Sequence, residues 1–178
     1  MLLMLPETTT DLRGPLVNDF DSRQLRNALG AFATGVTVIT TLDADGIPRA
    51  MTANSFSSVS LDPPLVLWSI GKSAMAFDAF TCCQHFVVHV LKQDQQALST
   101  RFASREARTF DDLTMEHGIG NVPMFSDYLA RFQCELYECL PGGDHVIVIG
   151  KVLDIEQQEG EPLLFYSGQY QALAGTAE

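Results

Sequence analysis

The chain has 178 residues, enough for one domain whose core needs no metal or disulfide to hold it together. Its 22 acidic residues against 11 basic ones give a net charge of −11, which disfavours nucleic acid and acidic membrane surfaces because binding to either is largely electrostatic. No apolar run reaches the ~20 residues of a membrane span, and the start lacks the basic region of a signal peptide, so we expect a cytoplasmic protein without a nucleic-acid or membrane partner.

The chain divides into one main domain with short extensions. Composition predicts a flexible N-terminal arm over 1–19, a single domain over 20–173 and a C-terminal tail over 174–178. In chain order, the patterns predict a helix over 22–33, strands over 35–41, 47–61 and 65–70, a short helix over 74–81, a strand over 85–91, a helix over 93–103, irregular chain over 109–127, strands over 129–140 and 145–158, and a closing extended segment over 163–173.

The spacing of apolar residues and the positions of turn residues indicate these elements. Leu25 to Phe32 carry an apolar stripe spaced by three and four residues, which is typical of a helix. Glycine-containing turns at 43–46, 141–144 and 159–162 join neighbouring extended segments. Because strands outnumber helices and do not alternate with long helices, the sequence predicts a mainly β fold: an antiparallel β-barrel with peripheral helices.

The most unusual segment is the run from Thr52 to Pro64, which is crowded with serine and asparagine. These residues are poor strand formers, and their side chains both donate and accept hydrogen bonds without adding charge. Such a run suits the polar edge of a planar heterocycle and a phosphate. An exposed, solvated edge strand explains the same composition equally well.

Other polar positions have two interpretations each. Lys72 and Ser73 follow a buried strand and precede a predicted helix, as in an anion site, or they lie in a solvated loop. His145 enters a strand from a turn, where it can donate, accept or titrate near neutral pH, or serve structure alone. Tyr166 and Tyr170 suit stacking on a ring, or packing in the core.

Several common sites are disfavoured. His85 and His89 are four apart in a predicted strand, too far for easy shared ligation, and no third ligand stands out, so we expect no metal site. No G-x-G-x-x-G follows a predicted strand, which argues against a Rossmann dinucleotide site. The cysteines, Cys82, Cys83, Cys134 and Cys139, form no C-x-x-C pair and are expected to be free thiols.

Several motifs in combination resemble the short-chain flavin reductase family. They are ALGAFATGVTVITT, MTANSFSSVSLDPPLVL, FVVHVL, RFAS, GGDHVIVIGKV and PLLFYSGQY, and the similarity covers roughly residues 20–173. The resemblance implies an FMN-binding split barrel, antiparallel and Greek-key-like. It also implies a homodimer that reduces FMN or FAD with NADH or NADPH and supplies reduced flavin to a partner monooxygenase.

The resemblance also implies site residues. His145 would be the catalytic residue, beside the nicotinamide. The implied cofactor-binding residues are Thr52, Ala53, Asn54, Ser55, Ser57, Ser58, Ser60, Lys72, Ser73, Arg101, Phe102, Asp144 and Tyr170. The chain departs from the usual family pattern at Ala31, Arg49 and His89, and Arg49 would replace the positive charge missing at position 31.

Hydride transfer between the two cofactors would then be the reaction, with the protein stacking the rings and tuning their electronics. Two alternatives stay open at the level of sequence. One is a flavoprotein that holds FMN tightly as an electron carrier, and the other is a split-barrel oxidoreductase that acts directly on an organic substrate.

Overall fold

A computed structural model of the protein describes residues 20–104 and 110–173. The predicted arm over 1–19 and the tail over 174–178 lie outside the described residues. The helices are α1 (Ser22–Gly30), α2 (Phe77–Cys82) and α3 (Gln96–Ala103), with short 3-10 turns η1 (Gln93–Gln95) and η2 (Ile119–Asn121). The strands are β1 (Thr34–Gly35), β2 (Thr37–Leu42), β3 (Pro48–Ala53), β4 (Ser57–Leu61), β5 (Pro64–Gly71), β6 (His85–Val90), β7 (Met115–His117), β8 (Pro123–Phe125), β9 (Ala130–Gly142), β10 (His145–Gln157), β11 (Leu164–Tyr166) and β12 (Gln169–Gln171).

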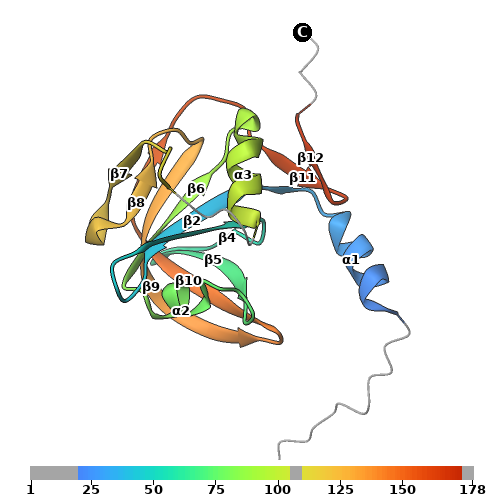
Figure 1. The fold of residues 1–178 in the computed structure, drawn as a ribbon. Helices are drawn as coiled ribbons and strands as arrows, with labels where there is room; N and C mark the ends of the chain where they lie inside the picture. The colour runs from blue at the N-terminus through green and yellow to red at the C-terminus, as the bar shows by residue number, and fades with distance from the viewer. Residues whose placement is uncertain (1–19, 105–109, 174–178) are drawn as a thin grey trace, which may run out of the picture.

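Seven strands form one antiparallel sheet in the order β3-β2-β6-β9-β10-β5-β4. Its two edge strands are consecutive in the chain and are separated only by residues 54–56. Four backbone steps reach at most roughly 14 Å, so the two edges of the sheet must lie near each other. The sheet therefore curls into a barrel that is open at one seam, and the prediction of an antiparallel barrel with peripheral helices is confirmed (Figure 1).

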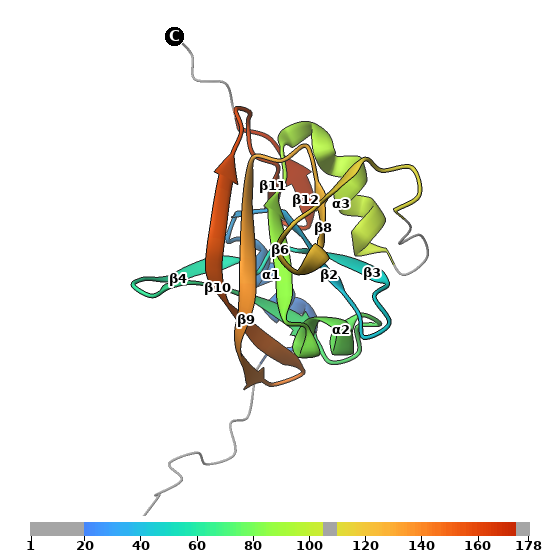
Figure 2. The same ribbon diagram turned by 90° about the vertical axis from the view of Figure 1, so that its left-hand side faces the viewer.

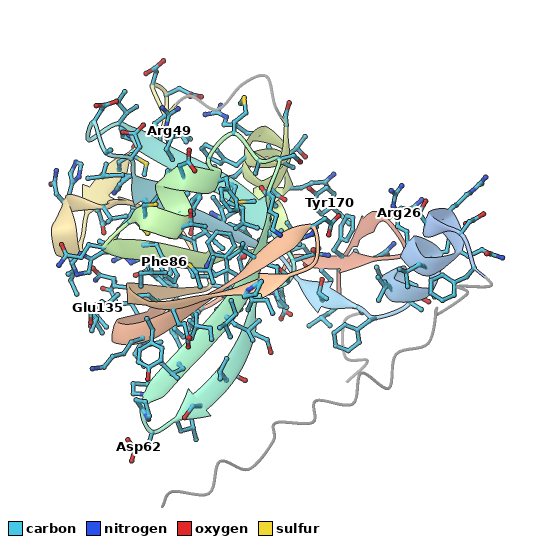
Figure 3. The ribbon with its side chains drawn as sticks, turned by 90° about the horizontal axis from the view of Figure 1, so that it is seen from below. Arg26, Arg49, Asp62, Phe86, Glu135 and Tyr170 are labelled. Atoms are coloured by element: carbon cyan, nitrogen blue, oxygen red, sulfur yellow. The ribbon has the colours of Figure 1, made fainter. Side chains whose placement is uncertain are left out.

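The extended run predicted over 47–61 is thus two strands. β3 pairs with β2, and β4 pairs with β5 on the other side of the seam. Asn54 and Ser55 of the serine- and asparagine-rich segment lie in the crossing between the two strands, where strand propensity is not needed, whereas Ser57, Ser58 and Ser60 lie in β4 itself. Beyond the crossing, the β4–β5 hairpin projects away from the barrel, with Asp62 near its tip (Figure 3).

The barrel interior holds the main core. On β5 the side chains of Val66, Trp68 and Ile70 point inward and alternate with outward ones, as strand geometry requires. The Trp68 ring contacts Phe80 of α2 and Phe86 of β6, with ring centroids 5.0 and 6.1 Å away. These contacts fix β5, β6 and α2 together.

β9 and β10 are the longest strands and run side by side across the barrel (Figure 2). A two-residue turn joins them, since His145 pairs with Gly142. Gly143 takes the positive φ of 70° that the first turn position of such a hairpin needs. The predicted turn at 141–144 is confirmed, and it holds His145 at the first position of β10.

Strand β6 is buried on both faces. Phe86 and Val88 point into the barrel, whereas Val87 packs against the β7–β8 hairpin in a separate small cluster. That hairpin lies within the region predicted to be irregular. Its strands are only three residues long, too short for periodicity to reveal them.

A second, three-stranded sheet in the order β1-β11-β12 lies beside α1 and α3 (Figure 1). The predicted helix over 22–33 ends early, at Gly30. The carbonyl of Gly30 accepts a hydrogen bond from the Ser167 N–H (2.8 Å) in the β11–β12 turn, so the end of the helix is held by the small sheet. Among the described residues, no helix is long and apolar enough to cross a membrane.

Candidate active site

A small cleft lies where three distant parts of the chain meet. It has a volume of about 150 Å³, and its lining residues are Val36, Thr52, Asn54, Ser99, Ala103, Phe165 and Tyr170. We call it the Tyr170 cleft. All of these lining residues are uncharged, and the rings of Phe165 and Tyr170 meet edge to face with centroids 5.4 Å apart. The cleft therefore suits an uncharged planar group better than a phosphate.

Hydrogen bonds join the walls of the Tyr170 cleft. The Thr52 hydroxyl on β3 donates to the Ser99 carbonyl on α3 (2.6 Å). The Ser99 hydroxyl lies 2.8 Å from the Tyr170 hydroxyl on β12. The end of β3, helix α3 and the C-terminal hairpin are thus linked through one residue.

A strip of polar groups leads away from the cleft along the seam. We call Asn54, Ser55, Ser57 and Ser69 the seam strip. The Ser55 hydroxyl accepts a hydrogen bond from the backbone N–H of Ser69 (2.9 Å), which attaches the crossing segment to the edge of β5 where β4 begins to pair. Asn54, Ser55 and Ser57 are exposed, so they can donate to or accept from a ligand without first giving up a bond to the core.

A third group lies at the tip of the β9–β10 hairpin, and we call Lys72, Asp144 and His145 the hairpin-tip group. Nδ1 of His145 lies 2.7 Å from Oδ1 of Asp144. A carboxylate only accepts, so Nδ1 carries the proton and Nε2 is left for a ligand. The same contact with His145 is the main cause that lowers the pKa of Asp144 below its usual value.

The strip connects the other two groups. Ser69 and Gly71 are two residues apart on β5, about 7 Å along a strand. Gly71 pairs with His145, whose Nε2 lies 3.6 Å from where a Cβ on Gly71 would be. Ser55 and His145 thus flank β5 from its two edges: Ser55 bonds to Ser69 on the β4 side, and His145 pairs with Gly71 on the β10 side. Lys72 follows Gly71, and its ammonium donates to the Gly143 carbonyl (2.6 Å), leaving further N–H groups for an anion.

The structure brings together most of the residues that the family resemblance implied. Those in the cleft, the strip or the tip group are Thr52, Asn54, Ser55, Ser57, Lys72, Asp144, His145 and Tyr170. Ser58 and Ser60 lie further out on the projecting hairpin, where Ser60 pairs with Leu65. Ala53 is buried, and its carbonyl accepts from the Thr37 hydroxyl (2.7 Å).

Two implied residues have other partners. Phe102 is fully buried and packs against Phe110 and Phe125, so its side chain is part of the core. Arg101 makes two hydrogen bonds to the Asp112 carboxylate (2.6 and 2.7 Å). Its charge is thus already paired, and the RFAS motif contributes Ala103 to the cleft wall instead.

The anion-site argument for Ser73 also changes. The predicted helix over 74–81 begins only at Phe77, with Ala76 as its N-cap and no side-chain cap. Ser73 is exposed in the loop before it. A six-residue helix that starts four positions later gives Ser73 no helix terminus to share with an anion.

Arg49, predicted to replace the charge missing at position 31, is also paired. Its guanidinium lies 2.7 Å from the Asp43 carboxylate in the β2–β3 turn. The hydrogen bond from the Ile47 N–H is the largest cause that lowers the pKa of Asp43. Figure 3 shows Arg49 and Tyr170 in different parts of the molecule.

Sequence reasoning missed Ser69 and Ser99. Ser69 carries no signal, because it takes part through its backbone N–H, which every residue type except proline offers. Ser99 carries none, because a serine on a predicted helix is usually solvated and only the packing of α3 buries it.

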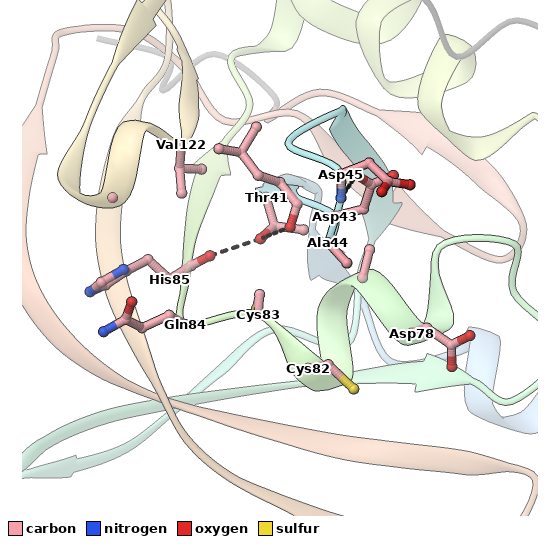
Figure 4. Close-up of a pocket in the computed structure, with 13 residues that line it drawn as sticks. Thr41, Asp43, Ala44, Asp45, Asp78, Cys82, Cys83, Gln84, His85 and Val122 are labelled. Carbon is pink, nitrogen blue, oxygen red and sulfur yellow. Dashed lines mark hydrogen bonds between the residues drawn. The ribbon is translucent and has the colours of Figure 1, made fainter.

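A larger pocket, about 520 Å³, lies elsewhere (Figure 4). The β2–β3 turn, the end of α2 and the start of β6 line it, and the Thr41 hydroxyl beside it donates to the His85 carbonyl (2.8 Å). None of the implied site residues lies in it. We place the site at the smaller Tyr170 cleft and the seam strip, because the ligand-capable polar groups converge there.

Comparison with known families settles the identity of the domain. The family described as flavin reductase like domain matches residues 29–174. The chain belongs to this family. The resemblance inferred from the motifs is therefore confirmed, and from here the protein is treated as a flavin reductase-like protein.

Relatives named as flavin reductases support the same assignment. The chain is 50% identical over 150 residues to the FMN reductase (NADH) SmoA of Agrobacterium fabrum, covering 84% of this chain and 85% of the relative. It is 39% identical over 151 residues to the flavin-dependent monooxygenase reductase subunit HsaB of Rhodococcus jostii, covering 84% and 77%. Some other curated relatives are longer, and the chain spans 51% and 48% of two of them.

A solved structure agrees over nearly the whole fold. The NADH:FAD oxidoreductase SgcE6 of Streptomyces globisporus C-1027, in complex with NAD and FAD fragments, superposes with a TM-score of 0.84 at 36% identity. The match covers 93% of this chain and 100% of that one. The fold described above is therefore the flavin reductase split barrel.

Proposed function

We propose that this protein reduces FMN or FAD with NADH and supplies the reduced flavin to a separate monooxygenase. The observation that carries the proposal is the uncharged seam strip, which runs between an aromatic-walled cleft and a histidine–carboxylate pair. The relatives are named for flavin reduction with NADH and for service to a monooxygenase.

The hydrogen-bonding groups of the seam strip fit a flavin. The seam strip offers hydroxyl and amide groups on the segment that crosses between β3 and β4, and these match a ring system that has both nitrogen and oxygen atoms along its edge. Asn54, Ser55 and Ser57 would hold and orient that edge. Lys72 would bind the phosphate, because it is the cation of the hairpin-tip group and keeps donors free beyond its bond to Gly143.

The Tyr170 cleft and His145 fit the nicotinamide nucleotide. An uncharged cleft with one aromatic wall accepts a flat ring, and the Asn54 amide can exchange paired hydrogen bonds with a carboxamide. Asp144 fixes the tautomer of His145 and so directs Nε2 toward the ligand. When bound, the nicotinamide supplies a hydride to the flavin, and the protein's part is to position both rings and exclude water.

A homodimer is part of the proposal. Leu25, Leu29 and Phe32 are 44%, 66% and 78% exposed and form the apolar stripe predicted for the first helix, which buries no residue of its own. Within 20–104 and 110–173, nothing covers this stripe. A second copy of the chain would bury it, and sedimentation of wild type against Leu29→Glu tests this: the variant should sediment as a monomer.

The domain bounds and the location are proposed on the same basis. Residues 20–173 form the catalytic domain, with 1–19 as an arm and 174–178 as a tail. All four cysteines are free thiols, which suits a reducing compartment and supports the cytoplasm, where NADH is available.

Steady-state assays test the proposed function. Purified protein is mixed with NADH or NADPH, with and without added FMN or FAD, and oxidation is followed by the loss of nicotinamide absorbance. We expect turnover with NADH that rises and saturates with free flavin. Protein that purifies with stoichiometric flavin and shows no turnover with free flavin would instead be an electron carrier.

A further inference from the structure

Ser99 differs from Thr100, the other hydroxyl residue of helix α3. Thr100, the next residue, donates to the carbonyl of Gln96 within α3 (3.0 Å), which is the usual arrangement for a hydroxyl in a helix. Ser99 is fully buried, and its hydroxyl instead bonds to Tyr170, 71 positions away in sequence. A buried hydroxyl placed on a tertiary partner rather than on its own helix links two elements of the fold.

The Ser99 carbonyl makes a second link. It accepts from the Thr52 hydroxyl (2.6 Å), and a carbonyl oxygen has two lone pairs, so this bond is compatible with a helical one. Ser99 thus contacts β3 with one atom and β12 with another. Ala103, four residues later on the same face of α3, completes the helical wall of the Tyr170 cleft.

Tyr170 depends on this support. It lies on β12, a three-residue strand at the edge of the small sheet, so its backbone has a partner strand on one side only. Its ring contacts Phe165 edge to face and packs against the core cluster that contains Val36 and Phe102, and its hydroxyl bonds to Ser99. Loss of the hydroxyl bond would leave the ring held by packing alone, without a fixed position for its polar end.

We propose that Ser99 is a positioning residue for the nicotinamide nucleotide: from behind the Tyr170 cleft it fixes the ring of Tyr170 in the orientation that binds this ligand. The inference rests on the proposed function. Ser99 itself is buried and acts through Tyr170, which forms the exposed surface of the wall.

The test is a pair of variants that remove the same bond from either side. Ser99→Ala and Tyr170→Phe, alone and combined, are compared with wild type for kcat and for the KM of NADH and of flavin. Each single variant should raise the KM for NADH about fivefold, the effect of one neutral hydrogen bond, and leave the KM for flavin unchanged. The double variant should resemble the singles, because both remove one interaction.

Two matched controls separate this role from general loss of a hydroxyl. Thr100→Ala removes a hydroxyl that bonds only within α3, and Tyr166→Phe removes one from β11 of the same hairpin. Both should keep wild-type KM values. Thermal melting checks folding of every variant, and if Ser99→Ala does not fold, Tyr170→Phe alone carries the test.

The outcomes are distinct. An unchanged KM for NADH in the folded single variants, or a double variant about 25-fold weaker as independent effects would multiply, overturns the role of Ser99. An equal rise in the KM for NADH and for flavin also overturns it. A wild type that never oxidises NADH with either flavin overturns the proposed function, and this inference with it.

Discussion

His89 should make the fold sensitive to mild acid. It is fully buried in β6, where Nδ1 lies 3.1 Å from the Val38 carbonyl and Nε2 accepts from the Phe125 N–H (3.1 Å). Nδ1 must therefore carry the proton, and Nε2 has none. Burial lowers the pKa of His89 to about 3, and the positive charge of Arg131 acts in the same direction.

The direction of this pH effect follows from the protonation of His89 in the folded and in the unfolded chain. Between the unfolded pKa of 6.5 and the folded pKa of about 3, the unfolded chain binds a proton at this residue and the folded one does not. Stability is therefore fully present above pH 6.5 and is lost as pH falls through this window. From pH 7 to pH 5 the loss amounts to about 2 kcal/mol, given about 1.4 kcal/mol for each pH unit.

Urea denaturation of wild type and His89→Asn at pH 7, 6 and 5 measures this effect. The variant loses packing against Phe125 at every pH, so the informative quantity is the change in unfolding free energy with pH, in which other titrating groups cancel. Wild type should lose about 2 kcal/mol more than the variant between pH 7 and pH 5. Equal pH dependence in both proteins would refute the assignment of a neutral, buried His89.

Three further predictions concern the barrel and the site. Gly150→Ala places a Cβ 2.4 Å from the Phe86 ring in the core and should lower the free energy of unfolding by about 2 kcal/mol or more. Gly35→Ala is the control: it has open space around it and should lower that free energy far less. Urea denaturation midpoints of the two variants test the difference. Ser55→Ala should weaken flavin binding by about 1 kcal/mol in a fluorescence titration, and complete loss of affinity would contradict a shared strip of neutral donors. Asp144→Asn removes the carboxylate that orients His145 and should lower kcat/KM for NADH by about tenfold, with flavin affinity unchanged; an unaltered kcat/KM would show that this pair does not serve the nicotinamide.

Local patterns predicted the elements better than they predicted the candidate site. The segments that became β9 and β10 were found from their alternation, and the segment that became β2, buried on both faces, was found from its β-branched residues. The turn before His145 was found because Gly143 is needed for its positive φ. The β7–β8 hairpin was missed, since three-residue strands carry too little pattern.

Some site residues could likewise be expected from the sequence, and others could not. The family resemblance implied that Thr52, Asn54 and Tyr170 belong to the cofactor site, and the structure places them around one cleft. The motif RFAS could not show that Phe102 points into the core while Ala103 faces the cleft, because this depends on how α3 packs. Arg49 and Arg101 were available cations in the sequence and are paired to Asp43 and Asp112 in the fold.

The sequence by itself determined the barrel class, the family and the polar character of the seam, since these depend on side-chain spacing and residue type along the chain. Only the tertiary structure decided that the serine-rich segment crosses an open seam, that Ser99 supports Tyr170 and that the stripe of α1 is left uncovered by the described residues. Each of these depends on contacts between residues far apart in sequence, and such contacts follow from how elements pack rather than from any local pattern.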